Sequence, residues 1–325
     1  MSGSITDVPG IEVGHADDPA GGTGCTVVLC RGGAVPGVDS RGGAPATRET
    51  DCLRPENVVP VAHAVFLTGG SAYGLDCAGG IMRCLEEQGV GFQTGAAVVP
   101  IVAGAALNDL AFGDPRARPD AAMGYAACRS ASAPETRQGN VGAGMGACIG
   151  RLAGNARGMM KGGLGTASLR VGELVVGVIV AVNCNGDVLD PETNRILAGT
   201  LTPDEKQIAG ARNLLLCPAG QYREGFPTNT TIGVVATNAA LTKAMATRVA
   251  MMVQDGYARA IHPIHTLGDG DVSFCLGAGV LKADINRVGA IAAWVTAQAI
   301  VNAVQAAETL HSVPCSRELL GRKRP

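Results

Sequence analysis

Short runs of β-branched and other apolar residues alternate along the chain with longer segments whose apolar positions recur at helical spacing. The apolar runs predict strands at residues 24–30, 64–68, 97–103, 174–183, 232–236 and 272–276. The helical spacing predicts helices at residues 77–88, 121–132, 203 onward, 242–261 and 284–307. Residues 169–171 are expected to pair with 174–183 as a hairpin, and 31–43 to form a glycine-rich loop. Strands and paired helices in both halves predict an α/β fold in which helices flank stacked sheets.

Composition narrows the class of protein. The 325 residues are 46% hydrophobic, enough for a large core, and length alone allows one large domain or two ordinary ones. A net charge of −2 and only 3% aromatic residues argue against a nucleic-acid surface. The first residues contain no basic region leading into an apolar one, so no secretory signal is expected. Thr, Gln and Asn interrupt the apolar stretch 290–304, and we expect no membrane partner.

The cysteines and histidines favour neither a metal site nor a disulfide framework. None of the 11 cysteines forms a Cys-x-x-Cys pair, and most lie among apolar or small residues, which indicates a reducing, cytoplasmic compartment. His262 and His265 lack cysteine partners at zinc-ligand spacing. The glycine-rich run 138–150 lacks the preceding strand and the later acidic residue of a dinucleotide site. We therefore expect no metal and no cofactor.

A threonine-rich segment, residues 227–241, leads directly into a predicted strand. In it Thr228, Thr230 and Thr231 surround Asn229. The ordinary interpretation is a strand with a polar start. The alternative is that cutting the Asn229–Thr230 bond makes Thr230 a new N-terminus, which carries a nucleophilic hydroxyl and a basic amine on one residue. The reference pKa of such an amine, about 7.7–8.0, lies close to neutral pH.

Other polar positions allow both a structural and a chemical interpretation. The segment Gly69–Asp76 is a plain turn or a loop that presents backbone N–H groups to an anion, and its Ser71 does not fit Gly-x-Ser-x-Gly. Lys161 is a solvated loop lysine or a site cation. Asn183 is a turn residue or an amide aimed at a substrate carbonyl. Asp269–Asp271, which reads Asp-Gly-Asp, is a hairpin turn, half a calcium loop without its remaining ligands, or a pair of catalytic carboxylates.

Taken together, these motifs make the chain similar to the L-aminopeptidase/D-esterase (DmpA) family, with its β-peptidyl aminopeptidases and endo-type 6-aminohexanoate (nylon) oligomer hydrolases. The matching motifs follow the family's order over nearly the whole chain: Leu67–Asp76, Gly139–Gly144, Lys161–Ser168, Asn183, Asn229–Asn238 and Asp269–Asp271. The resemblance implies a four-layer αββα sandwich, similar to that of N-terminal-nucleophile hydrolases but connected differently. It also implies a single domain over 1–325 that cuts itself into 1–229 and 230–325, and that assembles as tetramers or octamers of the paired chains.

The resemblance also implies roles for individual residues. It places five residues in the active site, with the threonine as nucleophile: Thr230, Lys161, Asn183, Asp269 and Asp271. Threonine after asparagine at the cut, and two aspartates where other members have serine and glutamate, are closer to the nylon-oligomer branch. Ser71, Tyr73 and Asn108 are expected to line the site, with a purely structural role as the alternative for Ser71. A family tyrosine falls near Asn108, where this chain has no tyrosine.

The expected chemistry follows from these roles. In self-cleavage the Thr230 hydroxyl attacks the Asn229 carbonyl, one of the aspartates or Lys161 takes the hydroxyl proton, and water hydrolyses the resulting ester. In the mature enzyme the Thr230 amine accepts the proton and passes it to the leaving amine. The Asn183 amide and a backbone N–H would stabilise the oxyanion. Lys161 would keep the amine neutral or assist the oxyanion, and the aspartates would orient the amine and Lys161 or bind a substrate ammonium.

The predicted function is that of an autoprocessing N-terminal-threonine amidohydrolase or aminopeptidase, acting on small amino-bearing peptides or amides through an acyl-enzyme. The alternative enzyme is an endo-type hydrolase of 6-aminohexanoate or related ω-amino-acid oligomers. An alternative of another class is an uncleaved, non-catalytic binding or scaffold protein. The expected partners are the substrate, the protein's own cleaved chain and further copies of itself.

Overall fold

The computed structural model describes residues 3–152, 158–217 and 229–321, and its main strands form two sheets that share one long strand. Sheet one contains β1 (Glu12–Asp18), the first half of β2 (Thr23–Ser40), β4 (Ala62–Thr68), β7 (Val102–Ala106) and β3 (Ala46–Arg48). Sheet two contains β10 (Gly163–Val171), β11 (Leu174–Val182), β14 (Ile232–Ala239), β16 (Val272–Leu281) and the second half of β2. Cys25–Leu29 of β2 pair with β4, whereas Val35–Ser40 pair with β16.

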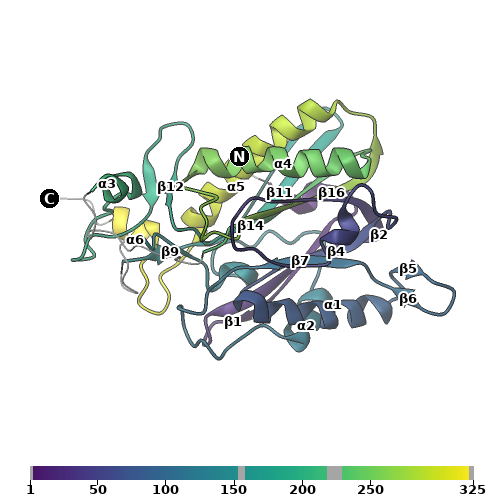
Figure 1. Cartoon of the computed structure of the whole chain (residues 1–325), viewed down its shortest axis with the longest axis horizontal. Coiled ribbons are helices and arrows are strands. Elements are labelled where there is room, and N and C mark those ends of the chain that lie inside the picture. Colours follow the sequence, from purple (N-terminus) through teal and green to yellow (C-terminus); the bar gives the residue numbers. More distant parts are fainter. Residues whose placement is uncertain (1–2, 153–157, 218–228, 322–325) are drawn as a thin grey trace.

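Helices cover the outer face of each sheet. Figure 1 shows α4 (Lys243–Ala260) and α5 (Ile285–Ala306) on one side, α1 (Cys77–Glu86) and α2 (Ala121–Arg129) on the other, and the strands between them. The side chains that α4 and α5 bury contact sheet two, and those of α1 and α2 contact sheet one. A third apolar core lies between the two sheets. This order of layers confirms the predicted αββα sandwich.

Strands of both sheets are buried on both faces, so their sequences are apolar almost without interruption. Successive residues nevertheless serve different cores. In β11, Val176 and Val178 pack toward α4 and α5, whereas Val175 and Ile179 pack toward the other sheet. The pairing of β14 with β16 is parallel, and β14 also pairs with β11 in antiparallel register. Strand β14 therefore lies inside sheet two, with a partner strand on each side.

The remaining elements are short. Three small sheets are formed by β5 (Phe92–Gln93) with β6 (Val98–Val99), by β8 (Cys148–Ile149) with β9 (Met160–Lys161), and by β13 (Ile196–Ala198), β12 (Asp187–Leu189) and β15 (Ile261–His262). The described residues also form helices α3 (Ala211–Leu216) and α6 (Ser316–Gly321) and the 3-10 turns Ile5–Asp7, Asp51–Leu53, Ser71–Asp76 and Gly142–Gly144.

Two sequence-based predictions were wrong. Residues 31–40, expected within a glycine-rich loop, continue strand β2, because Val35–Ser40 find a partner strand in β16. The glycine at Gly37 fits this role, since a Cβ there would lie 2.2 Å from a backbone carbon of α4. The helix expected from residue 203 begins only at Ala211, after Gly210, and the chain before it forms turns closed by a bridge between Leu201 and Ile208.

Helix α5 is the one described helix that is long and apolar enough, by length and composition, to cross a membrane. Its most apolar window is 72% buried inside the fold. Val288, Ile300 and Val304 belong to the core that α5 shares with sheet two. This degree of burial is typical of a helix in the core of a fold.

The close contact between α1 and α2 yields a stability prediction from two adjacent glycines. A Cβ at Gly80 would lie 1.7 Å from the carbonyl oxygen of Ala121, whereas nothing lies within 4 Å of a Cβ at Gly79. We expect Gly80→Ala to destabilise the fold by about 1–3 kcal/mol through overpacking. Gly79→Ala should stabilise it by about 0.5–1 kcal/mol, because alanine is the better helix former. Thermal and urea unfolding of the two variants checks this pair, and equal shifts of the same sign would contradict it.

Candidate active site

Thr230 lies where the ends of three neighbouring strands meet. It is 5% exposed and stands two residues before β14, between the end of β11 and the start of β16. Its backbone N–H donates to the carbonyl oxygen of Asn183 at 2.7 Å, and the N–H of Gly270 donates to the carbonyl oxygen of Asn229 at 2.9 Å. The Asn229–Thr230 peptide group is thus held at both its N–H and its C=O. Pro227 and Thr228, which precede it, lie outside the described residues.

Asp271 is fully buried and binds backbone on both sides of the site. Its Oδ1 accepts the backbone N–H of Thr231 at 2.7 Å. Its Oδ2 accepts the backbone N–H of His265 and lies 3.0 Å from the Nδ1 atom of the same histidine. The carboxylate therefore connects the residue after Thr230 to the turn at residues 265–266.

Asp269 has a parallel set of partners. Its Oδ2 accepts from the backbone N–H of Thr266 at 2.8 Å and from the hydroxyl of Thr266 at 2.6 Å. Its Oδ1 accepts from Nδ2 of Asn185 at 2.9 Å. Burial, reinforced by the nearby charge of Asp271, raises the pKa of Asp269 to about 6. The carboxyl group can therefore change its protonation state close to neutral pH.

The side chain of Asn183 is held at both ends. Its Oδ1 accepts the backbone N–H of Cys148 at 2.9 Å, and its Nδ2 donates to the carbonyl oxygen of Asn108 at 3.3 Å. Because the backbone oxygen of Asn183 also accepts from the N–H of Thr230, Asn183 links Thr230 to two loops.

Lys161 is completely buried and organises the loop that holds Asn183. Its ammonium group donates to the carbonyl oxygens of Gly144, Ala147 and Gly162 at 2.9, 2.8 and 3.2 Å. Burial lowers the pKa of Lys161 to about 8, an effect partly offset by Cys148 and Asp109. Three carbonyl acceptors match the three hydrogens of the cationic form. Lys161 is thus a fixed cation and not a solvated loop lysine.

The glycine-rich turn after β4 does hold an anion, but one that belongs to the chain. The backbone N–H of Gly70 donates to Oδ1 of Asp109 at 2.7 Å, and Thr23 donates its hydroxyl to the other carboxylate oxygen at 2.7 Å. The next N–H, that of Ser71, donates to the carbonyl oxygen of Leu107 at 2.9 Å. Burial raises the pKa of Asp109, and these donors oppose the rise.

The three residues predicted to line the site differ in position. Asn108 lies next to it, because its carbonyl oxygen accepts from Asn183. Ser71 lies further out: its backbone N–H bonds to the carbonyl oxygen of Leu107, the residue before Asn108. Its backbone is left-handed, with φ of 55°. Tyr73 is 58% exposed, and its ring lies 3.6 Å from the guanidinium carbon of Arg118, so it stacks at the surface.

Several residues of this network were not predicted. The sequence pattern indicates no role for Asp109, Asn185 or Thr266, and for His265 it raises only metal binding. Asn185 follows Asn183 at a strand end and Asp109 follows a buried strand, and such isolated polar residues were the only signal in the sequence. The partners of Asp109 and Asn185 lie far along the chain, so these pairings appear only in the fold.

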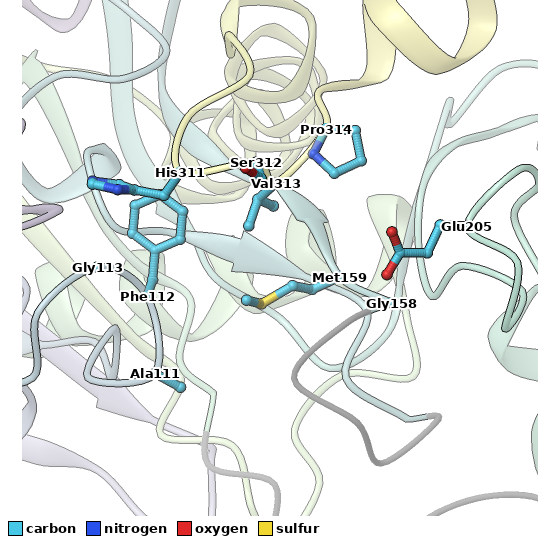
Figure 2. A pocket seen from close by; sticks show the side chains of 10 residues that line it. All are labelled: Ala111, Phe112, Gly113, Gly158, Met159, Glu205, His311, Ser312, Val313 and Pro314. Carbon is cyan, nitrogen blue, oxygen red and sulfur yellow. The ribbon is translucent and has the colours of Figure 1, made fainter.

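A cavity of about 440 Å³ adjoins the Lys161 segment. Figure 2 shows the rings of Phe112 and His311 on one side of it, Glu205 on the other and Met159 between them. The Phe112 ring centre is 5.2 Å from Nζ of Lys161. Thr230 is not among the described residues that line this cavity. It is large enough for a small amide-bearing molecule and lies on the Lys161 side of the hydrogen-bonded network.

These features define a four-layer α/β protein in which a threonine, two aspartates and an asparagine are buried around one peptide bond at the end of a central strand, and a buried lysine binds the loop that holds the asparagine. The profile of peptidase family S58 matches residues 3–315, and the chain belongs to this family. It is therefore an amide-bond hydrolase.

Known relatives agree with this assignment. An uncharacterised aminopeptidase of Mycobacterium leprae is 42% identical, with 96% of this chain and 92% of the relative covered. A 6-aminohexanoate-oligomer endohydrolase of a Kocuria species is 30% identical, with 92% and 85% covered. Among solved structures, the L-aminopeptidase D-Ala-esterase/amidase of Ochrobactrum anthropi has a TM-score of 0.73 at 19% identity, with 96% of this chain and 88% of that chain covered. A Burkholderia β-aminopeptidase has a TM-score of 0.67 at 21% identity, with 99% and 95% covered.

Proposed function

We propose that the protein cuts its own chain between Asn229 and Thr230, and that the freed Thr230 then hydrolyses amide bonds of small amino-bearing peptides or amides. The observation that carries this proposal is the bond of 2.9 Å from the N–H of Gly270 to the carbonyl oxygen of Asn229. This is the oxygen on which negative charge develops when a hydroxyl attacks that carbonyl. A donor fixed there in advance stabilises the transition state without reorganisation.

Self-cleavage would proceed as an acyl shift. The Thr230 hydroxyl oxygen bonds to the Asn229 carbonyl carbon and loses its proton to a base, and the oxyanion is held by Gly270. The C–N bond then breaks, the Thr230 nitrogen takes a proton, and an ester remains. Water hydrolyses the ester, which leaves the Asn229 carboxylate and a free threonine with its hydroxyl restored.

Asp269 is the best-suited base among the three candidates. Lys161 as a cation has no lone pair to accept a proton, and its three hydrogens are donated to carbonyl oxygens. Both carboxylates are held by hydrogen-bond donors, Asp271 by Thr231 and His265 and Asp269 by Thr266 and Asn185, so basicity separates them. Asp269, whose pKa is raised to about 6, is a stronger proton acceptor than an ordinary carboxylate.

The mature site would reuse the same groups. After the cut the Thr230 nitrogen remains next to the carbonyl oxygen of Asn183, which orients the amine that acts as base. The Gly270 N–H, released by Asn229, becomes the donor for the substrate oxyanion. The Asn183 amide is the second donor once it exchanges Asn108 for the substrate. We also expect the paired chains to assemble into tetramers or octamers in the cytoplasm.

Aminopeptidase activity is the first choice of reaction because the relative at 42% identity is named an aminopeptidase, whereas the 6-aminohexanoate-oligomer endohydrolase is 30% identical. The threonine after asparagine at the cut favours the second candidate, an endo-acting hydrolase of ω-amino-acid oligomers. The uncleaved scaffold is a third outcome, which the cleavage experiment tests directly.

Intact-mass analysis tests the cut. We expect two fragments from the wild-type chain, with the smaller beginning at Thr230, and one uncut chain of 32.8 kDa from Thr230→Ala. Thr231→Val is the matched control. The Thr231 hydroxyl has no hydrogen-bond partner among the described residues, and valine keeps its shape. A wild-type chain that remains whole, or a Thr230→Ala chain that is cut, would refute the assignment.

The pH dependence of self-cleavage tests the base. Thr230 has no free α-amine before the cut, so the acid limb of the self-cleavage rate should report Asp269. Below about pH 6 its carboxyl becomes protonated and can no longer accept the hydroxyl proton, so the rate should fall about tenfold per pH unit. Precursor made by rapid cell-free synthesis can be followed by gel electrophoresis across this range. Asp269→Asn should cleave slowly at every pH, and an unchanged acid limb in that variant would exclude Asp269.

Paired substrates separate the two reactions. An aminopeptidase should hydrolyse a short oligomer with a free amine and leave the N-acetylated oligomer intact, because the amine is part of what it recognises. An endo-acting enzyme should cut both at rates within about threefold of each other. Chromatography of the products, with Thr230→Ala as the inactive control, distinguishes these outcomes.

A further inference from the structure

The turn at His265 and Thr266 forms hydrogen bonds with both aspartates of the site, Asp269 and Asp271. His265 contacts Oδ2 of Asp271 through its backbone N–H and its Nδ1 atom, both at 3.0 Å. Thr266 contacts Oδ2 of Asp269 through its backbone N–H and its hydroxyl. In each carboxylate the other oxygen points toward the site, to the N–H of Thr231 or to Asn185. Each aspartate therefore bridges this turn and the groups around Thr230 by hydrogen bonds.

We propose that His265 is a positioning residue for the Thr230 nucleophile. Its Nδ1–H fixes the Asp271 carboxylate, and the opposite oxygen of that carboxylate holds the N–H of Thr231 at 2.7 Å. This N–H belongs to the peptide group that follows Thr230, so its position sets the direction of the Thr230 side chain. The inference rests on the proposed function, because it assigns a role within the same reaction.

The hydrogen bonds determine which nitrogen of His265 carries the proton. Oδ2 of the Asp271 carboxylate can only accept, so Nδ1 donates to it. Nε2 is buried and has no hydrogen-bond partner among the described residues. The groups that face the ring are Asp271 and Tyr257, whose ring centre lies 6.2 Å away, and Asp269 is reached through the adjoining turn.

The backbone at His265 gives an independent argument. Its φ is 59°, in the left-handed region that glycine and asparagine adopt more easily than histidine. A residue held there costs free energy, and such positions concentrate at functional sites. If this turn had only a structural role, glycine at position 265 would adopt the positive φ at a lower cost in free energy. Histidine at this position is explained by the donor that its ring supplies to Asp271.

The backbone conformation also supplies a matched pair of variants. His265→Gly and His265→Asn both tolerate a positive φ, and both keep the backbone N–H that donates to Asp271. They differ in the side-chain donor, because the Nδ2 group of asparagine takes the place of Nδ1 whereas glycine has none. His265→Gln places its amide at the position of Nε2 instead. The comparison separates the hydrogen bond from the ring volume and from the backbone strain.

The test measures self-cleavage and the kcat and KM of amide hydrolysis for wild type and all three variants, with thermal melts. We expect His265→Gly to slow self-cleavage and to lower kcat by roughly tenfold to a hundredfold with KM nearly unchanged, as for loss of one charge-assisted bond. His265→Asn should restore both rates to within about threefold of wild type, and His265→Gln should not. If the glycine variant fails to fold, the contrast between asparagine and glutamine decides.

Each remaining outcome overturns the proposal. Wild-type rates in His265→Gly would show that the donor is dispensable, and equal losses in the glycine and asparagine variants would show that only the ring matters. A wild-type chain that neither cuts itself nor hydrolyses amides removes the proposed function together with this inference. An active wild type with an equally active glycine variant removes this inference alone. His262→Asn, at an exposed histidine of the same segment, should leave both rates unchanged.

Discussion

Two backbone hydrogen bonds place the Asn229–Thr230 peptide group within the sheet, and the rest of the site depends on them. One runs from Thr230 to Asn183 at the end of β11, and the other runs from Gly270, just before β16, to Asn229. The peptide group therefore continues the pairing of three strands instead of projecting from a loop. A bond held this way has a fixed orientation relative to every neighbouring donor and acceptor. That fixed geometry is what proximity and preorganisation require of a reacting group.

Burial of charge is the second constraint, and backbone groups satisfy most of it. Lys161 is balanced by three carbonyl oxygens, and Asp271 by two backbone N–H groups and a histidine. Asp269 and Asp109 are likewise held by N–H and hydroxyl donors. A buried ion left without such partners would unfold the site or lose its charge. The loops of the site are thus shaped by the charges that they enclose.

The sequence predicted the layers of the fold better than the contacts of the site. Apolar periodicity located strand β11, helix α4 and helix α5 to within a few residues, because burial leaves a local pattern, but it predicted only residues 169–171 of β10. It failed for residues 31–40, where glycine and proline occur in a strand whose partner, β16, lies more than 200 residues further along. Thr230 was one of three candidate threonines until the family resemblance selected it. The roles of Asp109 and His265 depend on partners far away in the chain or on backbone angles, and composition carries no sign of either.

The position of β14 and β16 within sheet two determines how a cut chain could refold after denaturation. Both strands lie between β11 and β2, so the segment after Thr230 is inserted between two strands of the segment before it. A chain cut at that bond would consist of two interleaved pieces, neither of which has a complete sheet of its own. Folding would then be a unimolecular process that happens once, whereas recovery from denaturation would require two molecules to meet and would depend on concentration. The native state of the cut protein would be maintained by the height of its unfolding barrier.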